Sequence, residues 1–455
     1  MKEYDVIVIG SGAGASIVSA ALSRGLKTAL VDKGPLGGTC LNLGCIPSKM
    51  LIYPADVIAE IQEAKKLGIH AEITGIDFNS IMERMRGTVQ EGRSHIRTGI
   101  ESTEGLDFYE GEGHFIEDYT MEIKGEKING RKIFIASGAR PLIPPIKGID
   151  KIDYLTNENV LELKKRPESI VIIGGGYIAA EYGHFFASMG TAVTVLQRGD
   201  RLVPNEEPEI SDLLKKVMEK RMNIYMDTEA FEVRKNGDSY TVVGKDRNTG
   251  EEKELTGEKV MIAAGRKSNA DLLKVDNTGV ETDEGGFIVV NDHLETSKEN
   301  IWALGDAIGK QMFRHVANRE AVYVWHNATH EKKVKMDYRA TPRAVFSHPQ
   351  IASVGLTEAQ ARENHEILVG KAKYSDVAKG GAMMEEDGFA KAVVEKGSGK
   401  ILGFHIIGPH APILIQEVIN VMANEGTVQS IANGMHIHPA LSELILTTLG
   451  NLKEP

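Results

Sequence analysis

Two segments of the chain, VIVIGSGAGASIVSAALSRGLKTALVDKG (residues 6–34) and IVIIGGGYIAAEYGHFFASMGTAVTVLQRG (residues 170–199), repeat one design. Each has the pattern of a short apolar strand, a glycine turn, a helix of small residues and a second strand. Both turns fit the spacing Gly-x-Gly-x-x-Gly/Ala, with Gly10, Gly12 and Ala15 in the first copy and Gly174, Gly176 and Ala179 in the second.

This spacing has a physical purpose in phosphate binding. The first glycine makes a tight turn, the second lets the backbone approach a pyrophosphate, and the small third residue lets helix and strand pack closely. The phosphates then lie at the helix N-terminus. One unrelated glycine turn is common, but two in the same strand–turn–helix–strand context predict two dinucleotide-binding units.

The residue at the end of the second strand differs between the two units. Asp32 in the first unit suits the ribose hydroxyls of an adenosine. The aligned position in the second unit is Gln197, followed by Arg198 where the first unit has Lys33. Without a carboxylate to repel a 2′-phosphate, Arg198 and Arg201 favour NADPH, although a solvated arginine at a strand end is the simpler alternative.

Composition sets the broad class of the protein. A chain of 455 residues, 42% hydrophobic and 26% charged, suggests two to four globular domains. A net charge of −11 argues against nucleic acid as a partner, and no apolar run is long enough to span a membrane. The first apolar stretch begins at Tyr4, leaving no room for a leader peptide, so we expect a cytoplasmic protein.

Both cysteines of the chain, Cys40 and Cys45, lie in GGTCLNLGCIPSK (residues 37–49). On a regular helix this spacing gives about 7.5 Å of axial separation, more than the roughly 7 Å that a disulfide can bridge. A disulfide therefore needs a distorted turn, which Gly44 allows. So small a loop adds little stability, and no second Cys or His cluster suggests a metal. A disulfide that is reduced and formed again explains the spacing of these two cysteines best.

This dithiol segment resembles the redox-active signature of the flavin-dependent pyridine nucleotide–disulfide oxidoreductases, the glutathione reductase and dihydrolipoamide dehydrogenase family. The resemblance extends over nearly the whole chain, through both glycine turns, WALGDA (302–307) and HIHPALSE (436–443). Several blocks, such as GRKSNADLL (265–273) and HVANREA (315–321), are similar to mycothione reductases.

The resemblance implies an α/β fold with two doubly wound dinucleotide-binding domains and a C-terminal α+β dimerisation domain. It places an FAD domain with the dithiol at residues 1–145, an NAD(P) domain at 146–268, a return to the FAD domain at 269–335, and the interface domain at 336–455. It also implies a homodimer whose active sites are shared between subunits.

Cofactor contacts are carried over from the same resemblance. The positions expected to bind FAD are Gly10, Gly12, Gly14, Asp32, Lys33, Gly38, Thr39, Lys49, Gly113, His114, Ser137, Gly138, Asp306, Met312 and His315. The positions expected to bind NAD(P) are Gly174, Gly176, Tyr177, Ile178, Gln197, Arg198, Arg201 and Gly265, with Tyr177 as an aromatic gate over the flavin.

The resemblance also implies roles in catalysis. Cys45 would be the charge-transfer thiolate beside the flavin, and Cys40 would attack the substrate disulfide. Since only a thiolate does this chemistry, positive charge and a base must be close. Lys49 matches the family's lysine near the flavin, paired with Glu181 of the second unit.

The base is expected near the C-terminus. His438 and Glu443 have the HxxxxE spacing of the family's His–Glu pair, in which the carboxylate fixes the tautomer and raises basicity. Pro439 suits the first position of a helix that ends near Gly450. His436 is expected to be structural.

These observations predict an NADPH-preferring reductase of a small disulfide. Dihydrolipoamide dehydrogenase, acting with NAD, is the main alternative. Mercuric reductase is a more remote one, because the extra C-terminal cysteine pair of those enzymes is missing. A redox sensor without catalysis is also remote, because the dithiol, Lys49, His438 and Glu443 are all intact.

Overall fold

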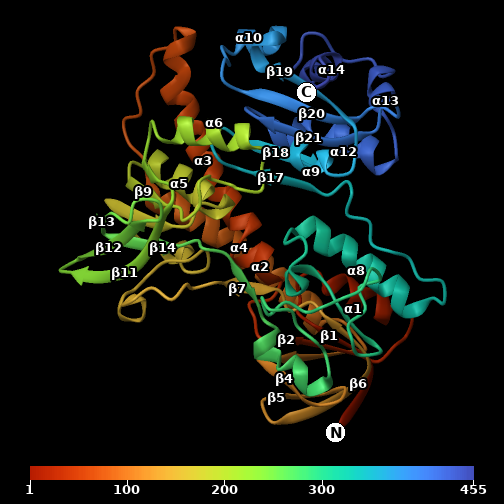
Figure 1. Cartoon of the computed structure of the whole chain (residues 1–455). Coiled ribbons are helices and arrows are strands. Elements are labelled where there is room, and N and C mark those ends of the chain that lie inside the picture. Colours follow the sequence, from red (N-terminus) through yellow and green to blue (C-terminus); the bar gives the residue numbers. More distant parts are fainter.

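The computed structural model describes residues 1–455, which form three lobes (Figure 1). The N-terminal lobe contains a seven-stranded sheet with the order β3-β2-β1-β6-β5-β4, and β16 pairs in parallel with β6. Its strands are β1 (Lys2–Ile9), β2 (Thr28–Asp32), β3 (Leu106–Glu110), β4 (Gly113–Glu117), β5 (Thr120–Ile123), β6 (Glu126–Ile135) and β16 (Ile301–Ala303).

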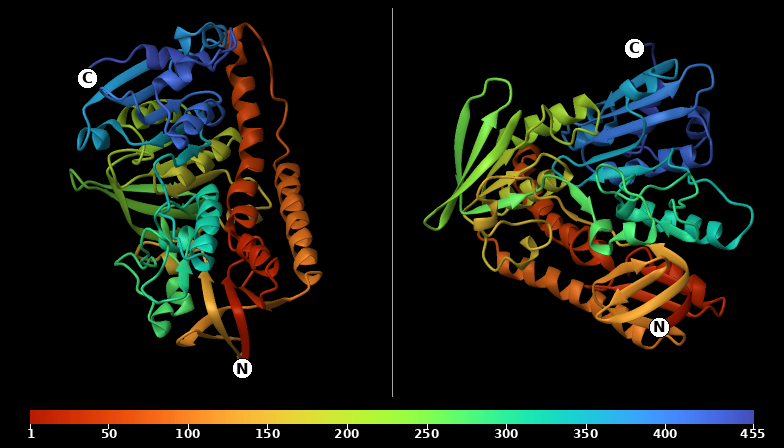
Figure 2. Two further views of the ribbon diagram at one scale, coloured as in Figure 1. Left: turned by 90° about the vertical axis from the view of Figure 1, so that its right-hand side faces the viewer. Right: turned by 60° about the horizontal axis from the view of Figure 1, so that its bottom comes forward.

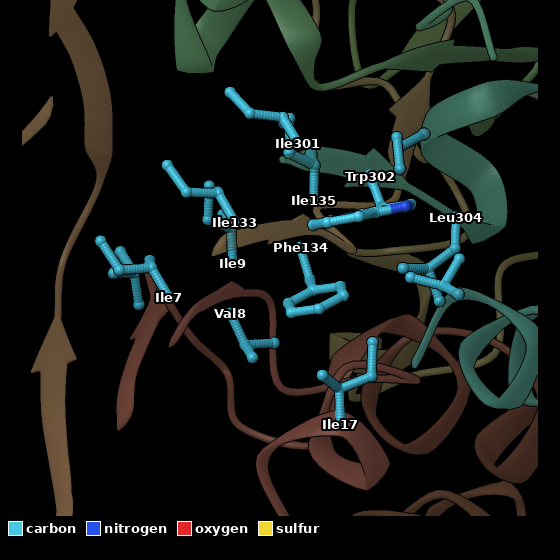
Figure 3. Packing of buried hydrophobic residues seen from close by; sticks show 14 of the residues in the cluster. Ile7, Val8, Ile9, Ile17, Ile133, Phe134, Ile135, Ile301, Trp302 and Leu304 are labelled. Atoms are coloured by element: carbon cyan, nitrogen blue, oxygen red, sulfur yellow. The ribbon is translucent and has the colours of Figure 1, made fainter. Parts of the chain in front are cut away.

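The apolar run that opens the chain forms the centre of this sheet. Val8 is in register with Phe134, and Phe134 with Trp302, across β1, β6 and β16. The rings of Phe134 and Trp302 stack at 5.2 Å between centroids, and Ile17 of the first helix packs near them (Figure 3). Strands buried on both faces in this way need continuous apolar sequence, which β1 supplies.

Helices place the chemistry-bearing residues around this sheet. The main ones are α1 (Ala15–Leu22), α2 (Gly38–Asn42), α3 (Cys45–Glu63), α4 (Phe78–Glu101) and α8 (Arg314–Thr329). Helices α3 and α4 run side by side along one side of the molecule (Figure 2). Phe78, Met82, Met85 and Val89 form the buried stripe of α4, at the spacing of one helix face.

The second lobe repeats the strand–turn–helix–strand design. Its parallel sheet has the order β10-β9-β8-β14, and a three-stranded antiparallel sheet β11-β12-β13 extends from it. The elements are β8 (Ser169–Ile173), α5 (Tyr177–Ser188), β9 (Ala192–Leu196), α6 (Pro208–Met218), β10 (Asn223–Tyr225), β11 (Thr228–Asn236), β12 (Ser239–Asp246), β13 (Glu252–Gly257) and β14 (Lys259–Ile262). The two-stranded pair β7 (Ala139–Pro141) and β15 (Arg266–Ser268) joins this lobe to the first.

The third lobe is an antiparallel sheet, β17-β18-β21-β20-β19, flanked by short helices. Its strands are β17 (Pro342–Val345), β18 (Ile351–Gly355), β19 (Ile367–Lys373), β20 (Phe389–Glu395) and β21 (Ile401–Ile407). Its helices are α9 (Glu358–Arg362), α10 (Ala378–Ala382), α11 (Ala411–Leu414), α12 (Gln416–Ala423), α13 (Val428–Ala432) and α14 (Glu443–Gly450). The predicted α/β fold class, with an α+β C-terminal domain, is confirmed.

One predicted boundary is wrong. The last helix ends at Gly450 as expected, but it begins at Glu443 and not at Pro439. The carboxylate of Glu443 accepts the backbone N–H of Ala440 at 3.0 Å and so holds residues 438–442 as turns. In the chain as a whole, no helix combines the length and the apolarity that crossing a membrane requires.

Candidate active site

The first glycine turn leaves no room for side chains. Gly10 has φ +103°, and a Cβ added there would lie 2.3 Å from the Ala136 carbonyl oxygen. A Cβ at Gly38 would lie 2.8 Å from the Cα of Gly12. The backbone of the dithiol segment therefore packs directly on the glycine turn at the N-terminus of α1. Such bare backbone, with free N–H groups, is what a pyrophosphate requires.

Asp32 is fixed by backbone groups at the end of β2. Its carboxylate accepts the N–H of Ser11 and of Gly34, both at 2.6 Å. Lys33 beside it is exposed. The carboxylate thus stands next to the glycine turn, where an adenosine ribose can reach it.

Two further groups fit a large cofactor in this lobe. The Ser137 hydroxyl is buried and has no hydrogen-bond partner in the protein. Asp306 lies 3.3 Å from Arg266, and burial raises the pKa of its carboxyl group. A hydroxyl-rich chain such as the ribityl group of FAD supplies partners for both, so the residues present fit FAD.

The other positions expected to contact FAD are spread over this lobe. Gly14 caps α1, Thr39 lies in α2 next to Cys40, and Gly113 and His114 begin β4. Gly138 follows Ser137 after β6, with φ +67°. Met312 precedes α8, whose His315 is turned outward and shares a hydrogen bond of 2.9 Å with the Pro342 carbonyl oxygen.

The second glycine turn has the same steric demand. Gly174 has φ +122°, and an added Cβ would lie 2.2 Å from the Ala263 carbonyl oxygen. The side chain of Gln197 covers Gly175, since a Cβ there would lie 2.7 Å from the Gln197 Cγ. Gly176 caps α5, and Tyr177 and Ile178 begin it; Gly265 precedes β15. Tyr177 is 41% exposed at the mouth of the turn.

Three arginines, Arg198, Arg201 and Arg247, lie near the end of β9. Arg198 is exposed and takes part in no ion pair, and Arg201 has only loose carboxylate neighbours at 3.8 and 3.9 Å. Gln197 donates to the Arg201 carbonyl oxygen at 3.0 Å. Arg247 donates to the Arg198 carbonyl oxygen at 3.1 Å. Sequence analysis missed Arg247, because it lies in the turn between β12 and β13 and belongs to no motif.

The dithiol lies at the break between two helices. Cys40 is in α2 and Cys45 is the first residue of α3, with Leu43 and Gly44 between them outside helical geometry. A Cβ at Gly44 would lie 3.1 Å from the Thr39 carbonyl oxygen. The distorted turn predicted from the spacing is therefore present, and Gly44 is where it occurs.

The two thiols are electrostatically unequal. The neighbouring Cys40 thiol lowers the pKa of Cys45 to about 7, with Lys49 and Arg314 acting in the same direction. The neighbouring Cys45 sulfur and burial raise the pKa of Cys40. Cys45 is therefore the thiol that ionises more readily.

Lys49 joins the two nucleotide units. Its ammonium group lies 2.8 and 2.7 Å from the two carboxylate oxygens of Glu181 in α5. Glu181 also accepts the backbone N–H of Phe346 at 3.0 Å, and the Lys49 ammonium lies 4.3 Å from the Phe346 ring centroid. Phe346, which sequence analysis did not single out, thus brings the third lobe into the site.

Arg314 is a second residue that sequence analysis missed. It begins α8, contacts the Gly12 carbonyl oxygen at 3.5 Å and lowers the pKa of both thiols through its charge. It lies next to the expected positions Met312 and His315, but no spacing rule singles it out. Only the fold brings the start of α8 to the dithiol.

The C-terminal His–Glu pair is formed but lies apart from the dithiol. His438 Nδ1 donates to Glu443 at 2.9 Å, which lowers the pKa of Glu443 and leaves Nε2 free. The His438 side chain is 72% exposed. Helices α13 and α14, which flank it, lie in the outer part of the third lobe, away from α2 (Figure 1). His436, in contrast, has a buried ring that pairs with Glu417 at 3.0 Å.

Comparison with known proteins identifies the family of the chain. The model of the pyridine nucleotide-disulphide oxidoreductase family matches residues 4–330, and the model of that family's dimerisation domain matches residues 341–449. A mycothione reductase of Mycobacterium tuberculosis is 34% identical over 100% of both chains. A dihydrolipoyl dehydrogenase of Bacillus subtilis is 31% identical over 97% of this chain and 96% of its own.

Two further relatives extend the range of activities. A mercuric reductase of Staphylococcus aureus is 34% identical over 90% of this chain and 75% of its own. Among solved structures, a Cu(II) complex of the HOCl-induced flavoprotein disulfide reductase RclA from Escherichia coli superimposes with a TM-score of 0.88, at 27% identity, over 99% of both chains. The chain belongs to the pyridine nucleotide–disulfide oxidoreductase family, whose members are FAD-dependent enzymes that use NAD(P)H.

Proposed function

We propose that this enzyme is an NADPH-preferring reductase of a small disulfide, active as a cytoplasmic homodimer. The reaction is NADPH + H⁺ + RSSR → NADP⁺ + 2 RSH. The observation that carries the proposal is the unequal setting of the two thiols: Cys45 begins α3 one turn before Lys49, which Glu181 holds and whose charge lowers the pKa of Cys45, while Cys40 lies in α2 across the break. A disulfide that only stabilises the fold does not require such a difference between its two sulfur atoms.

Each residue of the site has a separate task. FAD, which Gly10, Gly12, Asp32 and Lys49 would help to hold, would supply the two-electron carrier between the nicotinamide and the Cys40–Cys45 disulfide. Lys49, held by Glu181, and Arg314 keep the released Cys45 thiolate charged. Cys40, once its proton is removed, attacks one substrate sulfur and expels the other half as a thiol. Cys45 then attacks Cys40, which restores the disulfide and releases the second thiol.

The proton must be moved by a base, and the dimer supplies it in this proposal. His438 keeps Nε2 free while Glu443 fixes its tautomer. Because its own dithiol lies in a different part of the chain, we assign it to the dithiol of the other subunit. The match of residues 341–449 to the family's dimerisation domain supports this assignment.

The preference for NADPH is supported by the three arginines around Gln197. Arg198 is exposed and free of ion pairs, and Arg201 and Arg247, whose carboxylate neighbours come no closer than 3.8 Å, add positive charge nearby. No aspartate or glutamate occupies the position of Asp32 in this unit. Charge-assisted bonds from arginine to a phosphate are among the strongest polar contacts available.

Dihydrolipoamide dehydrogenase is the second candidate. The observation in its favour is that the dihydrolipoyl dehydrogenase relative aligns with 97% of this chain. That activity uses the same dithiol in the opposite direction, with NAD as the acceptor. The missing carboxylate at Gln197 and the free Arg198 speak against it, because an acidic residue at this position is what binds the ribose hydroxyls of NAD.

The first experiment measures NADPH oxidation by the purified enzyme against mycothione, glutathione disulfide, coenzyme A disulfide and lipoamide. Dihydrolipoamide with NAD is measured in the reverse direction. The Cys40→Ser variant is the control, since it should still accept electrons from NADPH but turn over no disulfide. Fast turnover of one thiol disulfide supports the proposal. Activity with the lipoamide couple alone would assign the enzyme to the second candidate.

A further inference from the structure

The β9–α6 loop (residues 197–207) carries Arg198 and Arg201 from the end of the second glycine unit to helix α6. The loop is tied to the second glycine turn by its backbone, since the Val203 N–H donates to the Gly175 carbonyl oxygen at 2.7 Å. The path of this loop therefore sets where the two arginines lie relative to the turn.

Val203 makes this bond in a conformation that valine rarely adopts. Its φ is +41°, in the left-handed region where a β-branched side chain is crowded, and the residue is buried. A backbone conformation of this kind persists only where the surrounding structure holds it in place. The β9–α6 loop therefore needs a firm attachment close to Val203.

The third lobe supplies this attachment three residues further along the loop. The Glu206 side chain is 4% exposed, and its carboxylate accepts Nε of Arg343 at 2.8 Å and Oγ of Ser353 at 2.6 Å. Arg343 also donates from Nη2 to the Asn205 carbonyl oxygen at 3.1 Å. Arg343 in β17 and Ser353 in β18 are partners in register, so their side chains leave the same face of the sheet. Three hydrogen bonds thus join one point of this sheet to the loop.

The attachment reaches Val203 through the backbone. The Glu206 N–H donates to the Val203 carbonyl oxygen at 2.9 Å, so the held carboxylate and the strained residue belong to one turn. Arg343 is the only cation paired with the Glu206 carboxylate, and without it a buried charge would be drawn towards water and would take the turn with it. The nearby pair of Lys391 with Glu207 is separate, because it holds the start of α6.

We propose that Arg343 is a positioning residue for the nicotinamide nucleotide. By holding Glu206 and the Asn205 carbonyl group, it keeps the β9–α6 loop bound to Gly175 and keeps the two arginines of the loop beside the glycine turn. Glu206 is too buried to contact a nucleotide, so the effect passes through the loop backbone. The inference rests on the proposed NADPH-dependent function and adds that the third lobe contributes to nucleotide affinity.

The test measures nucleotide binding by the flavin-loaded enzyme, so it needs no disulfide. In Arg343→Gln, the calorimetric affinity for NADP⁺ should fall at least tenfold. In stopped-flow experiments, the NADPH concentration that half-saturates flavin reduction should rise by the same factor, while the rate at saturating NADPH should change less than twofold. Arg339, in the turn before β17, makes only exposed pairs with Asp337 and Glu425. Arg339→Gln is therefore the matched control and should leave all three values unchanged.

Three further variants test the contacts one by one. Arg343→Lys keeps a charge opposite Glu206 and should recover part of the affinity. Ser353→Ala removes the other bond to the carboxylate and should lower the affinity two- to fivefold. The double variant Arg343→Gln/Glu206→Gln should bind NADP⁺ no more weakly than Arg343→Gln alone, because both changes break the same contact.

Unchanged affinity in a flavin-loaded Arg343→Gln, even one with a lower melting temperature, would overturn the proposal, because it would show a role in stability alone. If Arg343→Gln does not fold, Arg343→Lys and Ser353→Ala decide by the same measurements. The wild-type affinities for NADP⁺ and NAD⁺ test the proposed function separately. Tighter binding of NAD⁺ would contradict the preference for NADPH, whereas weaker binding of NAD⁺ by Arg343→Gln would still support the positioning role.

Discussion

The two nucleotide units share a backbone and differ in what surrounds it. In both, the first glycine has φ above +100° and touches the carbonyl of the neighbouring strand. The first unit is closed over by the dithiol segment, with Gly38 against Gly12, and ends in a carboxylate bound by two backbone N–H groups. The second unit is open, with an exposed Tyr177 and three arginines at its strand end.

The difference matches two ways of using a nucleotide. A closed site with a fixed carboxylate suits a cofactor that stays bound. An open site with free cations suits one that exchanges at every turnover. The glycine spacing alone does not separate these uses, because it reports only the need for backbone to approach a pyrophosphate. The residues at the end of the second strand and in the first turn of the helix separate the two uses.

The largest effect is expected from adding one methyl group to each turn. Gly10→Ala and Gly174→Ala each place a Cβ within 2.3 Å of a carbonyl oxygen, at a φ that alanine avoids. We expect Gly10→Ala to purify without flavin, and Gly174→Ala to retain flavin that NADPH no longer reduces. Absorbance of the purified proteins and stopped-flow reduction check this. The same defect in both variants would contradict the division of roles.

Buried ion pairs also join the second unit to the third lobe. The first unit has no such ion pairs with that lobe. Lys391 of β20 is 4% exposed and binds Glu207, just before α6, at 3.0 Å and Glu358 at 2.7 Å. Lys391→Ala leaves these carboxylates without their cation and should cost about 3–5 kcal/mol of unfolding free energy. Urea denaturation measures it. The exposed pair of Lys396 with Glu454 is the control, and Lys396→Ala should leave the denaturation midpoint nearly unchanged.

The preference for NADPH over NADH tests the role of the residues at the strand ends. Arg198→Ala should lower kcat/KM for NADPH about 10- to 100-fold, the value of one charge-assisted hydrogen bond, and leave NADH unchanged. Lys235→Ala, at an exposed position of β11 in the same lobe, should affect neither. Steady-state rates with NADPH and with NADH give the kcat/KM values that check both expectations. A higher kcat/KM for NADH than for NADPH in the wild type would remove the argument from Gln197 and Arg198.

The smallest effect on reactivity is expected at Lys49, which joins the two nucleotide units. With its pKa near 7, Cys45 gains reactivity as the pH rises through that value and loses it below, because only the thiolate reacts. Lys49→Met removes a charge that favours the thiolate, so the midpoint should move up by about one pH unit, a tenfold change at low pH. Alkylation of the reduced enzyme by iodoacetamide, followed by peptide mass spectrometry, measures the midpoint. Met50→Leu should leave it in place, and an unchanged midpoint in Lys49→Met would exclude the lysine's role.

The predicted elements were accurate where glycine sterics and strand ends set the local geometry, and one failed where a side chain returns to the backbone of its own segment. The glycine turns, the strand ends and the break at Gly44 follow from sterics within a few residues. The start of the last helix was predicted at Pro439, because proline suits a first turn, but the Glu443 carboxylate binds the Ala440 N–H and delays the helix. A side chain that returns to its own backbone in this way leaves no trace in hydrophobic periodicity.

By itself, the sequence determined the family, the α/β fold class and the dithiol, because these depend on spacings along the chain that short-range geometry enforces. Tertiary structure alone decided which charges surround the thiols and the nucleotide. Arg314, at the start of α8, lowers the pKa of Cys45 through its charge, and Arg247, in the turn between β12 and β13, donates to the Arg198 carbonyl oxygen. Coulomb interactions depend on distance in space, and folding sets that distance between residues hundreds of positions apart.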